Sequence, residues 1–242
     1  VHCVIIGFAL HDTDRKTIFD YEQINGTAHA IETKNINPYL VDAPDIVLMS
    51  SRTSICPVPE IVFGNMPNDG GNLLLSDTDK KDLLRSEPSA AKWIRPFLGA
   101  DEFLNGIPRW CLWLVDISPT ELRALPSVAK RVEAVRKYRA ESTREATRKL
   151  ADYPMLFGEI RQPKSNYLLI PRVSSENRNY IPIGFMPKTT IASDATLIIP
   201  HASLYHFGIL LSAMHMAWMR AVAGRLKSDY RYSGSIVYNN FP

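Results

Sequence analysis

The sequence has little cysteine, and no arrangement of it that would hold a metal ion or a disulfide framework. Its three cysteines (Cys3, Cys56 and Cys111) are far apart and odd in number, and no C-x-x-C pair occurs. The six histidines are scattered, without the spacing of a zinc-binding helix. We therefore predict no metal site, and the free thiols favour a reducing, cytoplasmic setting.

The sequence also lacks a secretory leader and a membrane span. The first residues, VHCVIIGFAL, are apolar but have neither a basic n-region nor a small-residue cleavage site. We predict a buried strand over Val1–Ala9, and a chain that starts inside a strand is interpreted as a fragment of something longer. A second apolar stretch, 203–226, is interrupted by His206, His215 and Arg220, which argues against a membrane helix and for a core helix.

Motifs for catalysis are missing too. No G-x-S-x-G, P-loop or glycine-rich nucleotide loop occurs, and Gly70-Gly71 lacks a strand–turn–helix context. A nuclease-like D…E-x-K arrangement does not stand out. Asn37-Pro38-Tyr39 lacks one proline of the N-P-P-[FYW] loop of amino-methyltransferases and is interpreted as a plain turn. We predict no catalytic and no cofactor-binding residue.

Charge is present but unevenly distributed. The chain of 242 residues is 45% hydrophobic, which is enough to bury a sizeable core, and its net charge is only +3. Residues 1–119 hold 10 basic and 16 acidic residues, whereas residues 120–178 hold 13 and 7. Such asymmetry indicates a nucleic-acid face on the second part, although a solvated basic helix would give the same pattern.

Local signals predict an α+β fold of mixed strands with a long basic helix and a long apolar C-terminal helix. Ser76 and Ser118 are placed to cap helices, and Ser118-Pro119-Thr120-Glu121 has the form of a capping box. Pro126 predicts a restart, after which valines at helical spacing alternate with many Lys and Arg residues. Strands are expected at 17–21, 46–49, 109–115, 166–173, 180–185, 195–200 and 230–238, with helical stretches at 76–85, 89–98 and 203–226.

The stretch Phe157–Phe185 carries the side chains that proteins use to contact phosphates and base edges. Two strand-like runs are joined by the polar turn 174–179, and the residues Arg161-Gln162-Pro163-Lys164-Ser165-Asn166 precede the first run. Such a hairpin could read nucleic acid. It could equally be a core hairpin with a solvated turn.

Nine segments carry a family resemblance, and they follow one another along essentially the whole chain. The sequence resembles part of the MmeI-like family of combined restriction–modification enzymes and related adenine-specific DNA methyltransferases. The segments are VHCVIIGFA, KNINPYLVDAPD, GNMPNDGGNLLLSD, IRPFLGADEFLNG, RWCLWLVD, LFGEIRQP, SSENRNYIPIGF, LYHFGILLSAMHMAWMRAVAGRLKSDYRYS and YNNFP.

The resemblance implies a domain that recognises duplex DNA beside an upstream methyltransferase domain. The parent enzyme would use S-adenosylmethionine to methylate adenine N6, and its donor and catalytic motifs would lie upstream, so this chain would hold no cofactor. Residues 1–31 would end the methyltransferase domain, 32–226 would form the target recognition domain, and 227–242 would start a C-terminal region. Candidate DNA contacts are Arg144, Arg148, Met155, Arg161, Gln162, Lys164, Asn166, Asn177, Arg178, Lys188 and Thr190.

The same residues also allow purely structural interpretations. Arg161 and Arg178 could pair with Glu159 or Glu176, and the turn at Lys188 could simply be solvated. The whole chain could instead be a protein-interaction or structural module of a larger enzyme, with its basic helix on an acidic partner surface. A nuclease fragment, the third possibility, would have to cleave DNA by itself.

Overall fold

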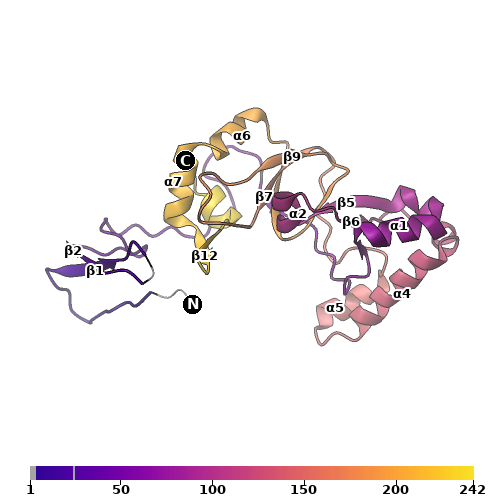
Figure 1. Ribbon diagram of the computed structural model, residues 1–242, viewed down its shortest axis with the longest axis horizontal. Coiled ribbons are helices and arrows are strands. Elements are labelled where there is room, and N and C mark those ends of the chain that lie inside the picture. The colour runs from indigo at the N-terminus through magenta and orange to yellow at the C-terminus, as the bar shows by residue number, and fades with distance from the viewer. Residues whose placement is uncertain (1–3, 24) are drawn as a thin grey trace.

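The computed structural model describes residues 4–23 and 25–242. Figure 1 shows three parts in a row. A separate hairpin of β1 (Lys16–Asp20) and β2 (His29–Thr33) lies at one end, paired in register from Lys16↔Thr33 to Asp20↔His29. A central lobe and a helical lobe follow, and each has its own sheet and core.

The helical lobe is a four-stranded sheet covered by helices. Its strand order is β10-β5-β6-β4, and β10 pairs parallel with β5 although the two strands are far apart in the sequence. The strands are β4 (Leu74–Leu75), β5 (Ile94–Leu98), β6 (Trp110–Leu112) and β10 (Ile191–Ala192). The helices are α1 (Asp77–Ser86), α3 (Pro119–Arg123), α4 (Pro126–Ala140) and α5 (Glu145–Lys149), with 3-10 turns at Pro88–Trp93 and Leu150–Asp152 and with α2 (Ala100–Asn105) after β5.

Local capping explains where these helices begin. The predicted cap Ser76 forms a capping box with Asp79 at α1, and the predicted capping box of Ser118 and Glu121 is present at α3. Hydrogen bonds from Lys92 and Ser118 hold the pKa of the Glu121 carboxyl at about 2. Pro126 occupies the first turn of α4, where its missing N–H costs nothing, and the predicted restart is confirmed.

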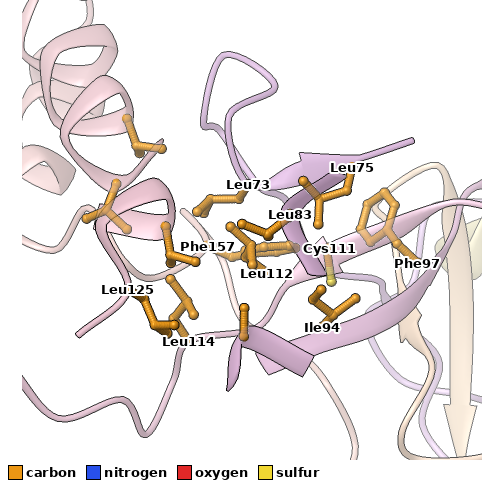
Figure 2. Close-up of a cluster of buried hydrophobic side chains, with 14 of the residues drawn as sticks. Leu73, Leu75, Leu83, Ile94, Phe97, Cys111, Leu112, Leu114, Leu125 and Phe157 are labelled. Atoms are coloured by element: carbon orange, nitrogen blue, oxygen red, sulfur yellow. The ribbon is translucent and has the colours of Figure 1, made fainter. Parts of the chain in front are cut away.

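Phe157 anchors the helical lobe and starts the stretch that carries most candidate contacts. Its ring meets Trp113 edge to face at 5.1 Å between centroids and Phe97 at 6.1 Å. Figure 2 shows it packed among Leu112 and the other apolar side chains of this core. Burial of such an aromatic ring fixes the chain entering residues 158–166.

The central lobe contains two sheets. The first has the order β3-β11-β7-β9 and the second the order β12-β13-β8. Its strands are β3 (Val62–Phe63), β7 (Tyr167–Pro171), β8 (Val173–Ser174), β9 (Gly184–Met186), β11 (Thr196–Pro200), β12 (Gly224–Leu226) and β13 (Asp229–Arg231). Helices α6 (Leu204–Leu210) and α7 (Ala213–Val222) and a π-helical turn at Gly234–Tyr238 complete it.

The predicted apolar helix over 203–226 is wrong in its length. It is divided into α6 and α7, because Ser212 accepts the backbone N–H of His215 at 3.1 Å and so caps a new helix. Residues 224–226 are a strand. Of the strand predicted over Tyr230–Tyr238, only the start belongs to β13, and the rest contains the π-helical turn.

The predicted long basic helix is also interrupted. It consists of α4 and the short α5, separated by residues 141–144, where the Ser142 hydroxyl accepts the N–H of Arg144 at 3.2 Å and competes with the helical pattern. Arg139 does not lie on its solvated face. It is fully buried, and its guanidinium donates to five backbone carbonyls, those of Pro67, Asn68, Leu150, Tyr153 and Leu156.

Three other predictions from short apolar runs are wrong. Of the strand predicted over Val1–Ala9, residues 1–3 lie outside the described part, and residues 4–9 form no strand and pair with no other described strand. Ile5 and Phe8 are 95% and 93% exposed, so no neighbouring strand buries this run. Ile46–Met49 is likewise not a strand, and the helix predicted over 89–98 is the 3-10 turn followed by β5.

Candidate functional site

Two segments that the sequence singled out separately lie side by side in the structure. The approach to β7 (Arg161–Asn166) contacts the turn between β9 and β10 (Pro187–Thr190), which we call the reading turn. The Gln162 amide donates to the carbonyls of Lys188 at 3.0 Å and Thr190 at 2.8 Å. Asn166 accepts the N–H of Lys188 at 3.2 Å, so both ends of the turn are tied to the approach.

The hydrogen-bonding capacity of Gln162 is used entirely inside the protein. Its two N–H donors are taken by the turn, and its oxygen accepts from Asn65 at 2.8 Å and from the Ala192 N–H at 3.4 Å. A primary amide offers two donors and two lone pairs. Gln162 therefore has no free group with which to contact a ligand, and its side chain shapes the reading turn.

Asn65 connects the reading turn to the rest of the fold. It is fully buried, donates to the Ala192 carbonyl at 2.9 Å and accepts the Arg161 N–H at 2.7 Å. The adjacent Gly64 permits this approach, because a Cβ at that position would lie 2.1 Å from the Ser193 carbonyl oxygen. Asn65 lies in no motif that the sequence analysis singled out, so its role was missed.

Tyr167 supplies one more bond to the turn. Its hydroxyl donates to the Thr190 carbonyl at 2.6 Å, and its ring is fully buried. Burial raises the pKa of Tyr167 to about 12, so the hydroxyl stays a donor at neutral pH. Thr190 is itself only 7% exposed, whereas the side chains of Pro187, Lys188 and Thr189 are exposed, and only the last two of these can form hydrogen bonds.

A hollow of about 480 Å³ borders the reading turn and is lined from both lobes. The helical lobe contributes Arg95 and Trp113, and the turn contributes Lys188 and Thr189. The sequence reasoning did not select Arg95 or Trp113, because they lie in an apolar run whose pattern indicates core. Arg95 donates one bond to the Ile94 carbonyl at 3.0 Å and is half-buried at the rim.

Arg161 and Lys164 differ in how free they are. The guanidinium of Arg161 pairs with Glu159 and donates to the Gly64 carbonyl at 3.3 Å, which matches one of the alternatives raised from the sequence. It also lies 6.0 Å from the centre of the Phe63 ring. Lys164 is exposed, and no hydrogen bond or ion pair with its ammonium is found within 4–23 and 25–242.

The turn with Asn177 and Arg178 belongs to a different surface. It follows β8, and its backbone N–H groups bond to Ser175 at 3.3 Å and 3.2 Å. Both side chains are exposed, and Arg178 forms no ion pair with Glu176 or any other described residue. The Glu176 N–H donates to Asp229 at 3.4 Å, which places this turn beside β13.

The remaining candidates, Arg144, Arg148 and Met155, lie at or near α5 in the helical lobe, and Figure 1 shows α5 well away from β9, after which the reading turn begins. Arg148 donates to the carbonyls of Ser142 and Thr143 at 2.9 and 3.0 Å and so closes the end of the interrupted helix. Arg144 is exposed just before α5. Met155 is half-buried and packs against the core of this lobe.

The described residues offer neither a metal site nor a membrane-spanning helix. Within that part of the chain, no cluster of three or more His, Cys, Asp or Glu side chains is arranged to hold a metal ion. No helix there has the length and apolar character needed to cross a membrane.

Comparison with known proteins identifies the family. DNA methyltransferase A of Bacillus subtilis (strain 168) is 40% identical over 99% of this chain, which corresponds to 27% of that protein. A solved structure of the type IIL restriction-modification enzyme MmeI in complex with DNA matches with a TM-score of 0.92 and 48% identity, over 95% of this chain and 31% of that one. The chain thus spans less than a third of these relatives. Residues 42–242 match the family described as MmeI, target recognition domain, and the chain belongs to that family.

Proposed function

We propose that this chain recognises a specific sequence in duplex DNA on behalf of an S-adenosylmethionine-dependent adenine-N6 methyltransferase. The observation that carries the proposal is the reading turn, a short exposed segment tied by four side-chain bonds from Gln162, Asn166 and Tyr167. The family membership of the chain and its similarity to a structure solved with DNA agree with this role.

The physical argument is that a rigid turn discriminates better than a mobile one. A methyltransferase must extrude its target base from the duplex, so other residues have to hold the flanking sequence in register. Base-edge contacts discriminate only if the contacting groups are held in place before binding. Lys188, at the tip of such a turn, can donate to guanine O6 and N7 in the major groove.

The predicted contacts then divide into three kinds. Lys188, Lys164 and Asn166 are proposed to reach DNA at the reading turn, with Arg161 beside them at its ion pair. Gln162, Thr190 and Met155 are proposed to act by position, since their side chains are engaged or buried. Asn177 and Arg178, and the more distant Arg144 and Arg148, are proposed as contacts to the phosphate backbone.

The proposed parent would bring the methyl donor and the catalytic groups from outside this chain. We retain residues 1–31 as the end of an upstream methyltransferase domain and 32–226 as the recognition domain. The proposed C-terminal region, 227–242, packs tightly on the central lobe: Asn239 and Tyr238 bond to the carbonyls of Ser51 and Pro59 at 2.8 and 2.7 Å. These contacts favour counting it with the recognition domain.

Two measurements test the function in the protein as its gene encodes it. Binding of a labelled duplex should weaken steeply as salt rises, because phosphate contacts release counterions. Sequencing of methylated DNA from expressing cells should then show one modified sequence. A folded protein without salt-sensitive DNA binding would overturn the proposal.

One observation favours a second role for the basic end of the helical lobe. Arg148 is used to bond carbonyls, as a structural residue would be. If this end is a protein-interaction surface, charge reversal at Arg144 and Arg148 would alter assembly and leave DNA affinity unchanged. If it contacts DNA, the same change would lower affinity.

A further inference from the structure

The hairpin of β12 and β13 concentrates positive charge in a part of the chain that the predicted contacts do not include. Its two strands pair from Gly224↔Arg231 to Leu226↔Asp229, and the two-residue turn Lys227-Ser228 joins them. Figure 1 shows β12 at the rim of the central lobe. Residues 220–231 hold four basic residues and one acidic residue: Arg220, Arg225, Lys227, Arg231 and Asp229.

These cations face solvent and are not neutralised. All four are exposed, and none of them forms an ion pair with another residue of the described chain. Asp229, the one carboxylate within the hairpin, is half-buried and accepts the N–H of Glu176 at 3.4 Å, and the exposed Glu176 forms no ion pair with any of the four cations. Exposed cations without ion-pair partners contribute little to holding the fold together, and their local excess of positive charge would attract a polyanion.

The conformation of Lys227 strengthens this interpretation. Its φ is +58°, in the left-handed region that costs a residue with a Cβ and that hairpin turns usually fill with glycine or asparagine. A lysine here places its ammonium at the tip of the hairpin at the expense of local backbone stability. Glycine would suit the fold better, so the lysine is consistent with a role in binding.

Arg225 has a structural role that has to be separated from binding. Its guanidinium lies 3.9 Å from the centre of the Tyr230 ring and donates to the Ser228 carbonyl at 3.0 Å. It therefore covers a buried tyrosine and braces the turn. Lys227 and Arg231 have no such side-chain bond within the described residues, and they are the positions at which charge can be changed with least effect on packing.

The hairpin also adjoins a surface already proposed to contact DNA. β13 pairs with β8 through Tyr230↔Ser174 and Arg231↔Val173, and the turn with Asn177 and Arg178 begins directly after β8. Its cations and Arg178 therefore belong to one end of the central lobe. Phosphates along a duplex are regularly spaced, so several cations at one end can engage successive phosphates together.

We propose that the β12–β13 hairpin, through Lys227 and Arg231 with Arg178 beside it, binds the phosphate backbone of the duplex whose bases the reading turn contacts. The hairpin supplies affinity and register, and the reading turn supplies discrimination. The inference rests on the proposed function, because it requires DNA as the ligand.

The test compares variants of the protein as its gene encodes it, using labelled duplexes with and without the modified sequence over a range of salt. Lys227→Gly should leave the stability of the protein unchanged or higher, and it should still lower the affinity for both duplexes by the same factor. Arg231→Gln should do the same, and each should lower the slope of log affinity against log salt by about 1. Arg85→Gln is the matched control, an exposed arginine on α1 paired with Asp82 at 3.0 Å, and it should leave both quantities unchanged.

Each outcome decides a separate question. If the unaltered protein binds DNA and both hairpin variants keep its affinity and its salt slope, the hairpin inference is overturned and the proposed function stands. If the unaltered protein binds no DNA, both fall. Loss of affinity for one duplex only would also overturn the inference, because it would make the hairpin a reader of bases.

Discussion

The side-chain amide of Asn65 donates to the side-chain oxygen of Gln162 across 2.8 Å, and Gln162 in turn holds the carbonyls of Lys188 and Thr190. This relay connects a buried residue of the scaffold with the segment proposed to read DNA. The shape of the turn is therefore set by Asn65 and Gln162, so its exposed side chains can change without changing that shape.

Removing the relay should loosen the reading turn. Gln162→Ala leaves two carbonyls and Asn65 without their partner, which should lower the free energy of unfolding by about 1–3 kcal/mol. The variant should also lose discrimination: its affinity for duplexes with the methylated sequence should fall by a larger factor than its affinity for unrelated duplexes. Urea unfolding and binding assays measure the two effects. Unchanged discrimination would show that the turn keeps its shape without Gln162.

Changing the exposed side chains of the reading turn should alter specificity and leave the fold intact. Lys188 is exposed, and only its backbone is bonded to the approach. Lys188→Ala should therefore change which sequence is methylated, or abolish methylation, with the unfolding midpoint unchanged. Substitution of Thr190, which is buried, should act on specificity and stability together.

Sequencing of methylated DNA from cells that express each variant gives the result. Lys81→Ala serves as the control, because this exposed lysine lies on α1 and pairs with Asp77 at 2.7 Å. If every variant at the reading turn methylates the original sequence, base reading is carried out elsewhere.

Arg139 should be among the most sensitive positions of the helical lobe. Its five bonds to carbonyls join α4 to residues 67–68 and 150–156. Arg139→Met keeps most of the volume but leaves these acceptors unpaired, so we expect a loss of about 3 kcal/mol or more in the free energy of unfolding. Lys137→Met, at an exposed position of the same helix, should change it by less than about 0.5 kcal/mol.

His215 should make the central lobe sensitive to acid. Burial lowers the pKa of His215 from 6.5 to about 4 while Nε2 lies 3.0 Å from the Tyr232 hydroxyl. Between those values the unfolded chain binds a proton that the folded protein does not, so stability falls as pH drops from 6.5 towards 4. The full shift corresponds to about 3 kcal/mol.

Urea unfolding across that range of pH, compared between the unaltered protein and His215→Gln, isolates this contribution. The variant should be less stable near pH 7 and should lose less stability on acidification. His29→Gln, at an exposed position of β2, should retain the full pH dependence. Equal pH dependence in all three proteins would place the acid sensitivity at another group.

Features fixed by neighbouring residues were predictable from the sequence. The caps at Ser76 and Ser118 and the strands around 167–171 and 196–200 follow from side chains within a few positions. Ser212 was missed because its capping group is hidden in an apolar run whose hydrophobicity alone indicates one helix. The strand predicted over Val1–Ala9 was wrong in its described residues 4–9 for another reason, since strand formation depends on a partner that no local pattern reveals.

The candidate site was predictable by residue type but not by role. Arg, Gln, Lys and Asn near 161–166 were selected because such side chains contact DNA, yet Gln162 is occupied by the turn. Its partner Asn65 is almost a hundred positions away. Arg139 shows the same limit, because a sequence cannot indicate which of many helical arginines faces carbonyls instead of water.

The reading turn lies between strands of two different sheets, since β9 pairs with β7 in one lobe and β10 pairs with β5 in the other. A relative displacement of the two lobes would therefore act on those few residues, as it would on the link from β10 to β11. The reading turn is therefore also a mechanical connection between the lobes, and strain from a poorly fitting duplex on one lobe would reach the other partly through residues that we propose to contact the bases.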